Sequence, residues 1–303
     1  MLAASGFNVT KVTDAQSSAE GVGLGLRHDL AEELFERAPD EVRWLEIHPE
    51  NYVRRGGRFA LNLERALEKW AIVPHGLSLC FGTTQRFEPA YLRQLKELLD
   101  RVDAPWYSDH LCFGGSGDVF LHDLLPLPFV RESIDTAAAR VREVEDAIGR
   151  PVAIENVSYY ADPAPRAMEE PDFVLEVLEA ADCKLLLDVN NVFVNAINHR
   201  FDPRTYIDRI PPDRVVQIHV AGHFTKKNGI IIDTHGEPVC EGVYDLLGYT
   251  LERLGPVPVL LERDQNIPPL DELLAEVRRL TDIYDRAMAV FEGRTAAPEA
   301  VAP

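Results

Sequence analysis

Val-Val-Gln-Ile-His-Val-Ala-Gly-His-Phe-Thr-Lys-Lys-Asn-Gly-Ile-Ile-Ile-Asp-Thr-His forms residues 215–235. A short apolar run ends in His219, His223 follows a glycine turn, and a second β-branched run leads to Asp233 and His235. Imidazole and carboxylate groups together suit zinc, iron, manganese or nickel, and packing alone does not require them where apolar strands end. The alternative is a set of solvated or hydrogen-bonded histidines. The same pattern recurs along the chain, which favours a metal site.

Length and composition describe an ordinary globular protein. The 303 residues are 46% hydrophobic and 27% charged, which is typical of a soluble domain with a substantial core. An α/β barrel commonly uses about 250 residues as one domain. The sequence contains no run of 18 apolar residues, so no membrane span is predicted. The formal net charge of −19 repels nucleic acid and anionic lipid surfaces, so neither is expected as a partner.

The cysteines and the chain ends bear on location and domain limits. Four cysteines, Cys80, Cys112, Cys183 and Cys240, show no Cys-x-x-Cys spacing, so we expect reduced thiols and a cytoplasmic protein rather than a zinc ribbon or a disulfide framework. Residues 1–20 lack the basic start and apolar core of a signal peptide and are predicted to be a disordered extension. Residues 292–303 are predicted to be a disordered tail. This leaves 21–291 as a single domain.

Working outward from residues 215–235, short strand-like runs alternate with helical patterns. Together with the opening stretch, the runs cover 22–27, 44–48, 72–79, 106–111, 152–154, 184–187 and 257–261. Helices are predicted over 29–37 (capped by Asp29), 61–70, 89–100, 131–148, 171–181, 242–254 and 270–291. Eight such βα units are the number that closes a (β/α)8 TIM barrel, which is therefore the predicted fold. The long connection 114–128 is predicted to be a loop that serves a site.

A doubly wound open sheet is the competing fold. Such sheets usually carry a glycine-rich phosphate turn after the first strand. Here Gly21, Gly23 and Gly25 precede or lie inside that strand, which disfavours the open sheet.

Metal-type ligands lie at or just past the ends of the second to eighth predicted strands. They are His48, His75, His110, Glu155, Asp188, His219 and Glu262. In a barrel these ends converge on one face, where active sites are built. Ionised carboxylates there are costly to desolvate unless a cation or hydrogen-bond donors compensate. Helix N-caps or a salt bridge, for instance to Arg263, would be the alternative explanation for the acids.

There are more ligands than one ion can use, because iron or zinc takes four to six. Two or three ions are therefore expected. Since no Cys stands at these strand ends, a thiolate structural zinc site is disfavoured, and mixed His and carboxylate shells are typical of reactive iron or hydrolytic metals.

A set of ordered motifs resembles the multinuclear non-haem iron-dependent oxidative enzymes, the family that includes the iron subunit of methanobactin biosynthesis. The motifs are His75-Gly, Ser-Asp-His110-Leu, Asp-Leu-Leu-Pro-Leu-Pro, Glu155-Asn, Leu-Leu-Leu-Asp188-Val-Asn-Asn, Ile-His219-Val-Ala-Gly-His223, Ile-Asp233-Thr-His235-Gly and Leu-Glu262. They span residues 21–280. The departures are Asp109 for a common Glu, Val157 for Pro and Arg263 for Trp, and none of them removes a ligand.

The resemblance implies a xylose-isomerase-like barrel that holds two or three iron ions in mixed Fe(II)/Fe(III) states. It also implies O2 as co-substrate, a ribosomally made precursor peptide as substrate, often modified at Cys, and in many members a small leader-binding partner protein. His75, His110 and Glu155 would hold one iron. Glu155, Asp188, His219 and Glu262 would hold a second, which completes the implied catalytic set. Asp233 and His235, with Asn191, would hold a third, while His48, Asn156 and His223 would support the ligands.

The leading hypothesis from the sequence is therefore an iron-dependent, O2-using peptide-modifying oxidase. A Zn- or Mn-dependent hydrolase or isomerase on a barrel of the sugar-isomerase kind is the alternative enzyme. A non-catalytic metal-binding module is the third hypothesis, and it predicts that replacing His219 or Glu262 leaves the biological role intact.

Overall fold

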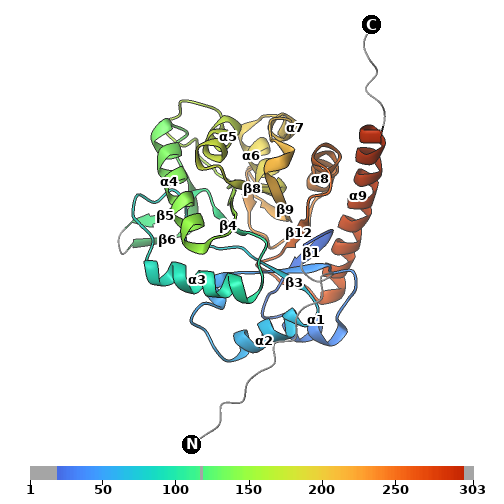
Figure 1. The fold of residues 1–303 in the computed structure, drawn as a ribbon. Helices are drawn as coiled ribbons and strands as arrows, with labels where there is room; N and C mark the ends of the chain where they lie inside the picture. The colour runs from blue at the N-terminus through green and yellow to red at the C-terminus, as the bar shows by residue number, and fades with distance from the viewer. Residues whose placement is uncertain (1–18, 117–118, 297–303) are drawn as a thin grey trace, which may run out of the picture.

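A parallel eight-stranded sheet forms the centre of the molecule in a computed structural model that describes residues 19–116 and 119–296 (Figure 1). Its strand order is β3 (Ala71–Pro74), β2 (Trp44–Ile47), β1 (Val22–Gly25), β12 (Val259–Glu262), β9 (Val215–Ala221), β8 (Lys184–Asp188), β7 (Val152–Glu155) and β4 (Tyr107–His110). A parallel bridge between His75 and Ser108 brings β3 to β4 and closes the ring. The predicted barrel is confirmed.

Helices surround the sheet (Figure 1). They are α1 (Ala31–Arg37), α2 (Arg58–Leu67), α3 (Pro89–Arg101), α4 (Arg131–Ile148), α5 (Glu170–Ala181), α6 (Val189–His199), α7 (Pro203–Ile207), α8 (Glu241–Leu254) and α9 (Leu270–Ala296), with 3-10 turns η2 (Pro49–Asn51) and η3 (Pro212–Arg214). Helix α4 shows why they form. Its buried residues Ile134, Val141, Val144 and Ile148 recur at helical spacing. Gly149 ends it with a φ of 68° that suits glycine.

The strands form the core because both of their faces are covered. All residues of β1, β2, β4, β7 and β12 are buried, as expected for parallel strands inside a shell of helices. The strands are largely apolar, and the buried side chains of Glu46, His110, Glu155 and Glu262 meet at the barrel end described below. The fold thus excludes water from the region where those charges meet.

Several predicted boundaries differ from the structure. The third strand ends at Pro74, before the predicted 79. The predicted loop 114–128 contains the hairpin of β5 (Cys112–Ser116) and β6 (Val119–Pro126), because its apolar residues pair antiparallel across a turn. Asp29 does not cap α1; the N-cap is Leu30, whose N–H bonds to the Arg27 carbonyl.

Two further elements follow candidate ligands directly. Helix α6 begins immediately after Asp188, and a hairpin of β10 (His223–Thr225) and β11 (Ile231–Asp233) follows β9. Helix α9 extends to residue 296, five residues past its predicted end. The remainder of the predicted disordered ends, 1–18 and 297–303, lies outside the described residues.

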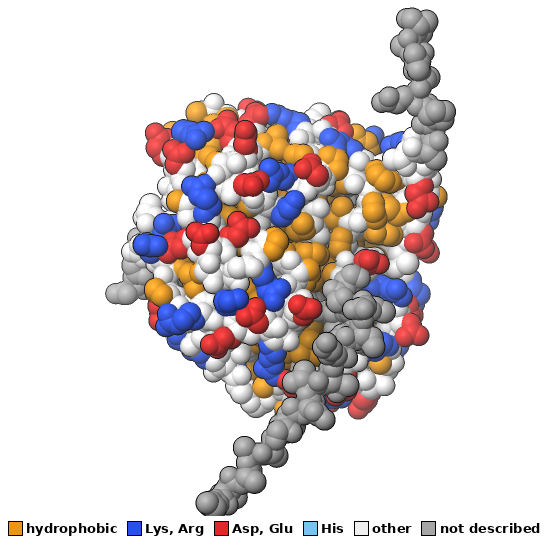
Figure 2. All heavy atoms as spheres, in the orientation of Figure 1, with side chains coloured by type: hydrophobic (Ala, Val, Ile, Leu, Met, Phe, Trp, Pro, Cys, Tyr) orange, Lys and Arg blue, Asp and Glu red, His pale blue; other side chains and the backbone are white. Residues whose placement is uncertain are grey.

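Within residues 19–116 and 119–296, no helix combines the length and apolar character needed to cross a membrane. On the face drawn in Figure 2, acidic and basic side chains are intermixed and separated by apolar ones. The negative net charge is therefore not gathered into one patch on this face.

Candidate metal centre

Adjacent strands of the barrel place candidate ligands side by side at the carboxyl end of the sheet. In the pairing of β4 with β7, His110 lies opposite Glu155. In the pairing of β8 with β9, Asp188 lies opposite His219. Glu262 ends β12, which neighbours β9. Because parallel strands end at the same rim, these side chains share one pocket.

Glu155 is at the centre of a first group. Its Oε2 lies 3.1 Å from His75 Nε2 and 3.2 Å from His110 Nε2. Its Oε1 lies 3.4 Å from His219 Nδ1. All four side chains are buried, so one carboxylate with two oxygens faces three imidazoles away from water.

Glu262 connects the first group to the hairpin. Its Oε2 lies 3.0 Å from His219 Nδ1 and 3.3 Å from His235 Nδ1. His235 Nε2 lies 2.7 Å from Asp233 Oδ1. The antiparallel pairing of β10 with β11 places Asp233 beside His223, so the hairpin folds the second half of residues 215–235 back over the barrel end.

Three sets of side chains each bring one ligand atom per residue within 4.8 Å of one another. They are His75, Glu155 and His219; Glu155, Asp188, His219 and Glu262; and His48, Glu262 and Asp264. The second set has the membership implied by the resemblance. The first set contains His219 where His110 was expected, with His110 alongside. The third set brings together His48 and Asp264 rather than Asn191, Asp233 and His235.

Many polar atoms of this pocket are buried and have no hydrogen-bond partner among the described residues. They are His75 Nε2, His110 Nδ1, Glu155 Oε2, Asp188 Oδ2, Asn191 Oδ1, His219 Nδ1, His235 Nε2 and Glu262 Oε2. Several lie within ion-pair distance of one another, yet they do not meet hydrogen-bond geometry. A buried polar atom that is left with no partner at all costs about 1–3 kcal/mol. A cation held between them removes that cost, and nitrogen and oxygen donors of this kind fit first-row transition metals such as iron.

The electrostatics indicate the same need for positive charge. Burial alone would lower the pKa of His219, but the carboxylates of Glu46, Glu262 and Glu155 outweigh burial and raise that pKa well above its usual range. Burial and the neighbouring charge of Glu155 raise the pKa of Asp188 well above its usual range. Without a metal ion, the pocket therefore retains protons that a divalent cation would replace.

Hydrogen bonds orient several ligands. Ser108 Oγ is 2.9 Å from His75 Nδ1, which leaves Nε2 facing Glu155. The Asn156 side chain binds the backbone of Asp188 twice, donating to its carbonyl and accepting from its N–H, each at 2.9 Å. Such contacts fix ligand geometry before any ion binds.

The alternative explanations for the acids hold only in part. Asp188 does cap α6, because its Oδ1 accepts from the Asn191 N–H at 2.7 Å, but its Oδ2 stays unpaired. Arg263 pairs with Glu276 at 2.6 Å rather than with a candidate ligand. With an arginine, Glu262 makes only a long contact of 3.8 Å, to Arg27. Capping and salt bridges therefore leave much of the buried negative charge uncompensated.

The predicted supporting residues lie in distinct places. Asn156 holds Asp188 as described. His48 Nδ1–H donates to the His75 carbonyl, 3.1 Å away. His223 is half-buried, with Nδ1 2.8 Å from Asn190 Oδ1 and its ring stacked on Phe193.

Sequence reasoning missed Glu46, Gln217, Asp264 and Arg27. Glu46 Oε2 lies 2.8 Å from His219 Nε2 and accepts from Gln217 Nε2 at 2.6 Å. Arg27 NH2 binds Asp264 Oδ1 at 2.5 Å. The signal for Glu46 was available, because an acid inside the apolar run 44–47, two residues before His48, must point into the barrel.

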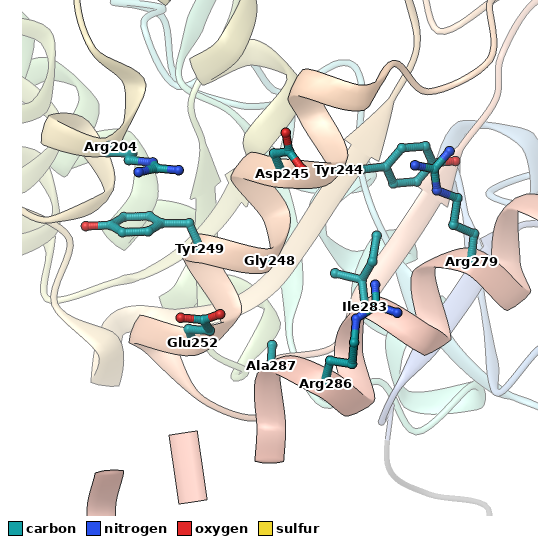
Figure 3. A pocket seen from close by; sticks show the side chains of 10 residues that line it. All are labelled: Arg204, Tyr244, Asp245, Gly248, Tyr249, Glu252, Arg279, Ile283, Arg286 and Ala287. Carbon is teal, nitrogen blue, oxygen red and sulfur yellow. The ribbon is translucent and has the colours of Figure 1, made fainter. Parts of the chain in front are cut away.

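A groove of about 630 Å³ lies elsewhere, on the outer wall between α8 and α9 (Figure 3). The guanidinium of Arg279 lies 3.9 Å from the ring centre of Tyr244, and that of Arg204 lies 4.9 Å from that of Tyr249. None of the candidate ligands lines this groove. The site is therefore defined by its chemistry and not by open space.

Comparisons with known proteins agree with this arrangement. The family described as RiPP precursor modification enzyme MbnB/TglH/ChrH matches residues 21–285. A UPF0276 protein of Pseudomonas aeruginosa is 45% identical over 267 residues, covering 88% of this chain and 93% of the relative. One of Shewanella amazonensis is 42% identical over 266 residues, covering 88% and 95%.

Solved structures of other enzymes share the fold. An L-ribulose 3-epimerase matches with a TM-score of 0.58 at 11% identity, over 93% of this chain and 99% of the other. Endonuclease IV from Thermus thermophilus matches with a TM-score of 0.55 at 12% identity, over 88% and 99%. At such low identity these similarities show the barrel and nothing of its chemistry.

Proposed function

The chain belongs to the MbnB/TglH/ChrH family of RiPP precursor modification enzymes, and we propose that it is an iron-dependent, O2-using oxidase that modifies a ribosomally made precursor peptide, with Cys as the expected target. The observation that carries the proposal is the set of unpaired, buried nitrogen and oxygen atoms at one end of the barrel. Within the described residues none of these atoms has a hydrogen-bond partner, although several face one another at ion-pair distance. Imidazole nitrogens and carboxylate oxygens are ligands that suit iron.

The residues offer places for two or three ions. His75, Glu155 and His219, with His110 alongside, would hold one iron. Glu155, Asp188, His219 and Glu262 would hold a second. For a third, Asp233, His235 and Asn191 remain the proposal, with His48 and Asp264 as competing ligands. Bound iron supplies electrons and open positions at which a substrate thiolate and O2 can react.

We assign His223 the role of taking a proton from a substrate thiol. Asn190 Nδ2 donates to Asp233 Oδ1 at 2.8 Å, so its Oδ1 must accept a hydrogen from His223 Nδ1. That bond leaves Nε2 with its lone pair. Burial lowers the pKa of His223, which keeps the imidazole neutral and able to accept the proton near neutral pH.

The proposal includes the substrate's surroundings. A peptide made in the cytoplasm would meet the enzyme there, which fits the four free cysteines. A small partner protein that binds the peptide leader is also part of the proposal, as the family resemblance implies. Its requirement is tested by comparing reactions with and without the neighbouring gene product.

Metal analysis of protein purified without oxygen tests the function. We expect at least one iron per chain, O2 consumption after iron loading, and a mass change in a short Cys-bearing peptide encoded beside the gene. Glu155→Gln is the matched inactive control, because it retains shape but removes the charge at the centre of the ligands. Native protein that holds zinc or manganese instead, and consumes no O2 after iron loading, would support the hydrolase or isomerase.

A further inference from the structure

Two of the four cysteines pack against each other beside the candidate metal centre. Cys80 and Cys112 are both buried and form one small cluster with Val157. The backbone around Cys80 runs beside that of Cys112, because Gly82 N–H donates to the Cys112 carbonyl at 2.8 Å and Phe81 N–H donates to the His110 carbonyl at 3.1 Å. The two thiols are therefore neighbours on adjacent stretches of chain.

The local backbone is shaped to hold the Cys80 thiol there. Cys80 has a φ of 47°, in the left-handed region that costs a non-glycine residue about 1 kcal/mol or more. Its N–H lies 3.4 Å from Asp109 Oδ1. At Gly114, a Cβ would lie 2.4 Å from the Cys80 Sγ. A glycine on the neighbouring strand thus leaves the space that the sulfur fills.

The dithiol is close to a candidate ligand. Cys112 is two residues from His110, and Asp109, which receives the Cys80 N–H, lies 3.7 Å from His110 Nδ1. Cys183 and Cys240 do not lie next to a candidate ligand in this way. Cys183 precedes β8 at the opposite end of the barrel, and Cys240 is the N-cap of α8.

Resting on the proposed function, we propose that Cys80 and Cys112 are an internal reductant of the metal pocket. The Cys80–Cys112 pair gives two electrons and two protons and closes to a disulfide. Without a peptide, O2 takes them and leaves as hydrogen peroxide. When the peptide also gives up two hydrogens, the four electrons and four protons convert O2 to two molecules of water. A cellular thiol reductant then reopens the disulfide by exchange.

Thiol mapping after air exposure tests the inference. Protein loaded with Fe(II) without oxygen is exposed to air, denatured in iodoacetamide and digested. We expect Cys80 and Cys112 to lose alkylation together and to appear as one cross-linked peptide pair, two hydrogens lighter than the separate peptides. Cys183 and Cys240 should stay alkylated. Iron-free protein and His219→Ala should retain all four alkylated cysteines.

Variants exclude a structural role. Cys80→Ala should leave Cys112 alkylated after air exposure and lower the hydrogen peroxide released without peptide, whereas Cys183→Ser should leave the cross-link unchanged. If iron oxidises visibly in air while Cys80 and Cys112 stay fully alkylated, the inference is wrong and the proposed oxidase survives. If the protein binds less than one iron per chain, both fail, and the metal content identifies that case.

Discussion

Two sets of buried carboxyl groups in this molecule have opposite surroundings. Glu155 and Glu262 face imidazoles at 3.0–3.4 Å in the barrel end. Glu170, at the start of α5, is also buried, but its contacts are to uncharged groups: the Asn195 side-chain amide at 3.3 and 3.5 Å and the hydroxyls of Tyr159 and Tyr206. No Lys or Arg of the described residues forms an ion pair with it. The surroundings, not burial itself, distinguish the two sets.

The protonation of these acids follows from that difference. Burial raises the pKa of Glu170 to about 8, so this carboxyl is mostly neutral at neutral pH. The pKa of Glu155 falls below its usual range, because His110, His75 and His219 outweigh a burial effect of the same sign as at Glu170. A charged acid in the core thus needs positive partners, and at the barrel end metal ions would provide them.

We expect the largest effect from removing one of the charged carboxylates that face imidazoles. Glu155→Gln removes the charge that faces His75, His110 and His219. We expect iron affinity to fall by more than about 100-fold, since even residues behind the ligands are worth 10–100-fold, and peptide oxidation to be lost. Iron content after desalting measures this. Glu170→Gln is the matched control and should retain iron; equal iron in both variants would contradict the comparison.

Removing the metal should be the next largest effect. A ligand present at 100–1,000 times its Kd stabilises the folded state by about 3–4 kcal/mol. A strong chelator should therefore lower the unfolding free energy of iron-loaded protein by about this amount, measured by urea unfolding under nitrogen. The same chelator should leave Glu155→Gln unchanged. Similar losses in both proteins would indicate that the pocket is not the place where iron binds.

Glu170 should make stability depend on pH in the direction opposite to a salt-bridged acid. Its pKa is higher in the folded state than the ordinary 4.5, so the folded chain binds a proton that the unfolded chain lacks between about pH 4.5 and 8. Stability from this group is complete below that range and lost as pH rises through 8.

In Glu170→Gln the free energy of unfolding should therefore decrease less as the pH rises. Relative to the wild type, the variant should be more stable at pH 9 than at pH 6 by a few kcal/mol, since each pKa unit corresponds to about 1.4 kcal/mol. Urea unfolding at pH 6 and pH 9 measures the difference between the two proteins. A gap that does not change with pH would show that Glu170 is ionised at both values.

The smallest expected effect concerns ligand orientation. Ser108→Ala removes the hydroxyl 2.9 Å from His75 Nδ1. We expect iron affinity to fall about tenfold, or about 1.4 kcal/mol, because the imidazole loses the contact that fixes its rotation. Competition with a chromogenic chelator measures the affinity. Ser133→Ala, on α4 away from the pocket, should have no effect, and an unchanged affinity in Ser108→Ala would assign the hydroxyl a packing role only.

The sequence was sufficient to predict the barrel and the positions of the candidate ligands at its rim, because both depend on local patterns. Strand length, helical spacing and a polar residue after each strand can be seen one segment at a time. The hairpin β5–β6 was mistaken for a loop, since its two short strands are stable only against each other and the barrel.

The contacts around His219 were beyond local patterns. Glu46 and His219 are separated by 173 positions in the sequence and meet at 2.8 Å. The grouping of ligands depends on where each strand ends in the ring, which explains why His219 and not His110 completes the first close set. The spacing of residues in the sequence predicts which side chains reach the rim of the barrel. Which of these side chains contact one another depends on the order of the strands around the barrel.

The order of strands in the sheet has a consequence for synthesis. Strand β12 carries Glu262 and pairs with β1, the first strand of the chain, so the final candidate ligand emerges from the ribosome long after the first strands. At about 5–20 residues per second, the nascent chain lacks it for roughly 10–50 s. The complete set of candidate ligands therefore comes together only near the end of translation.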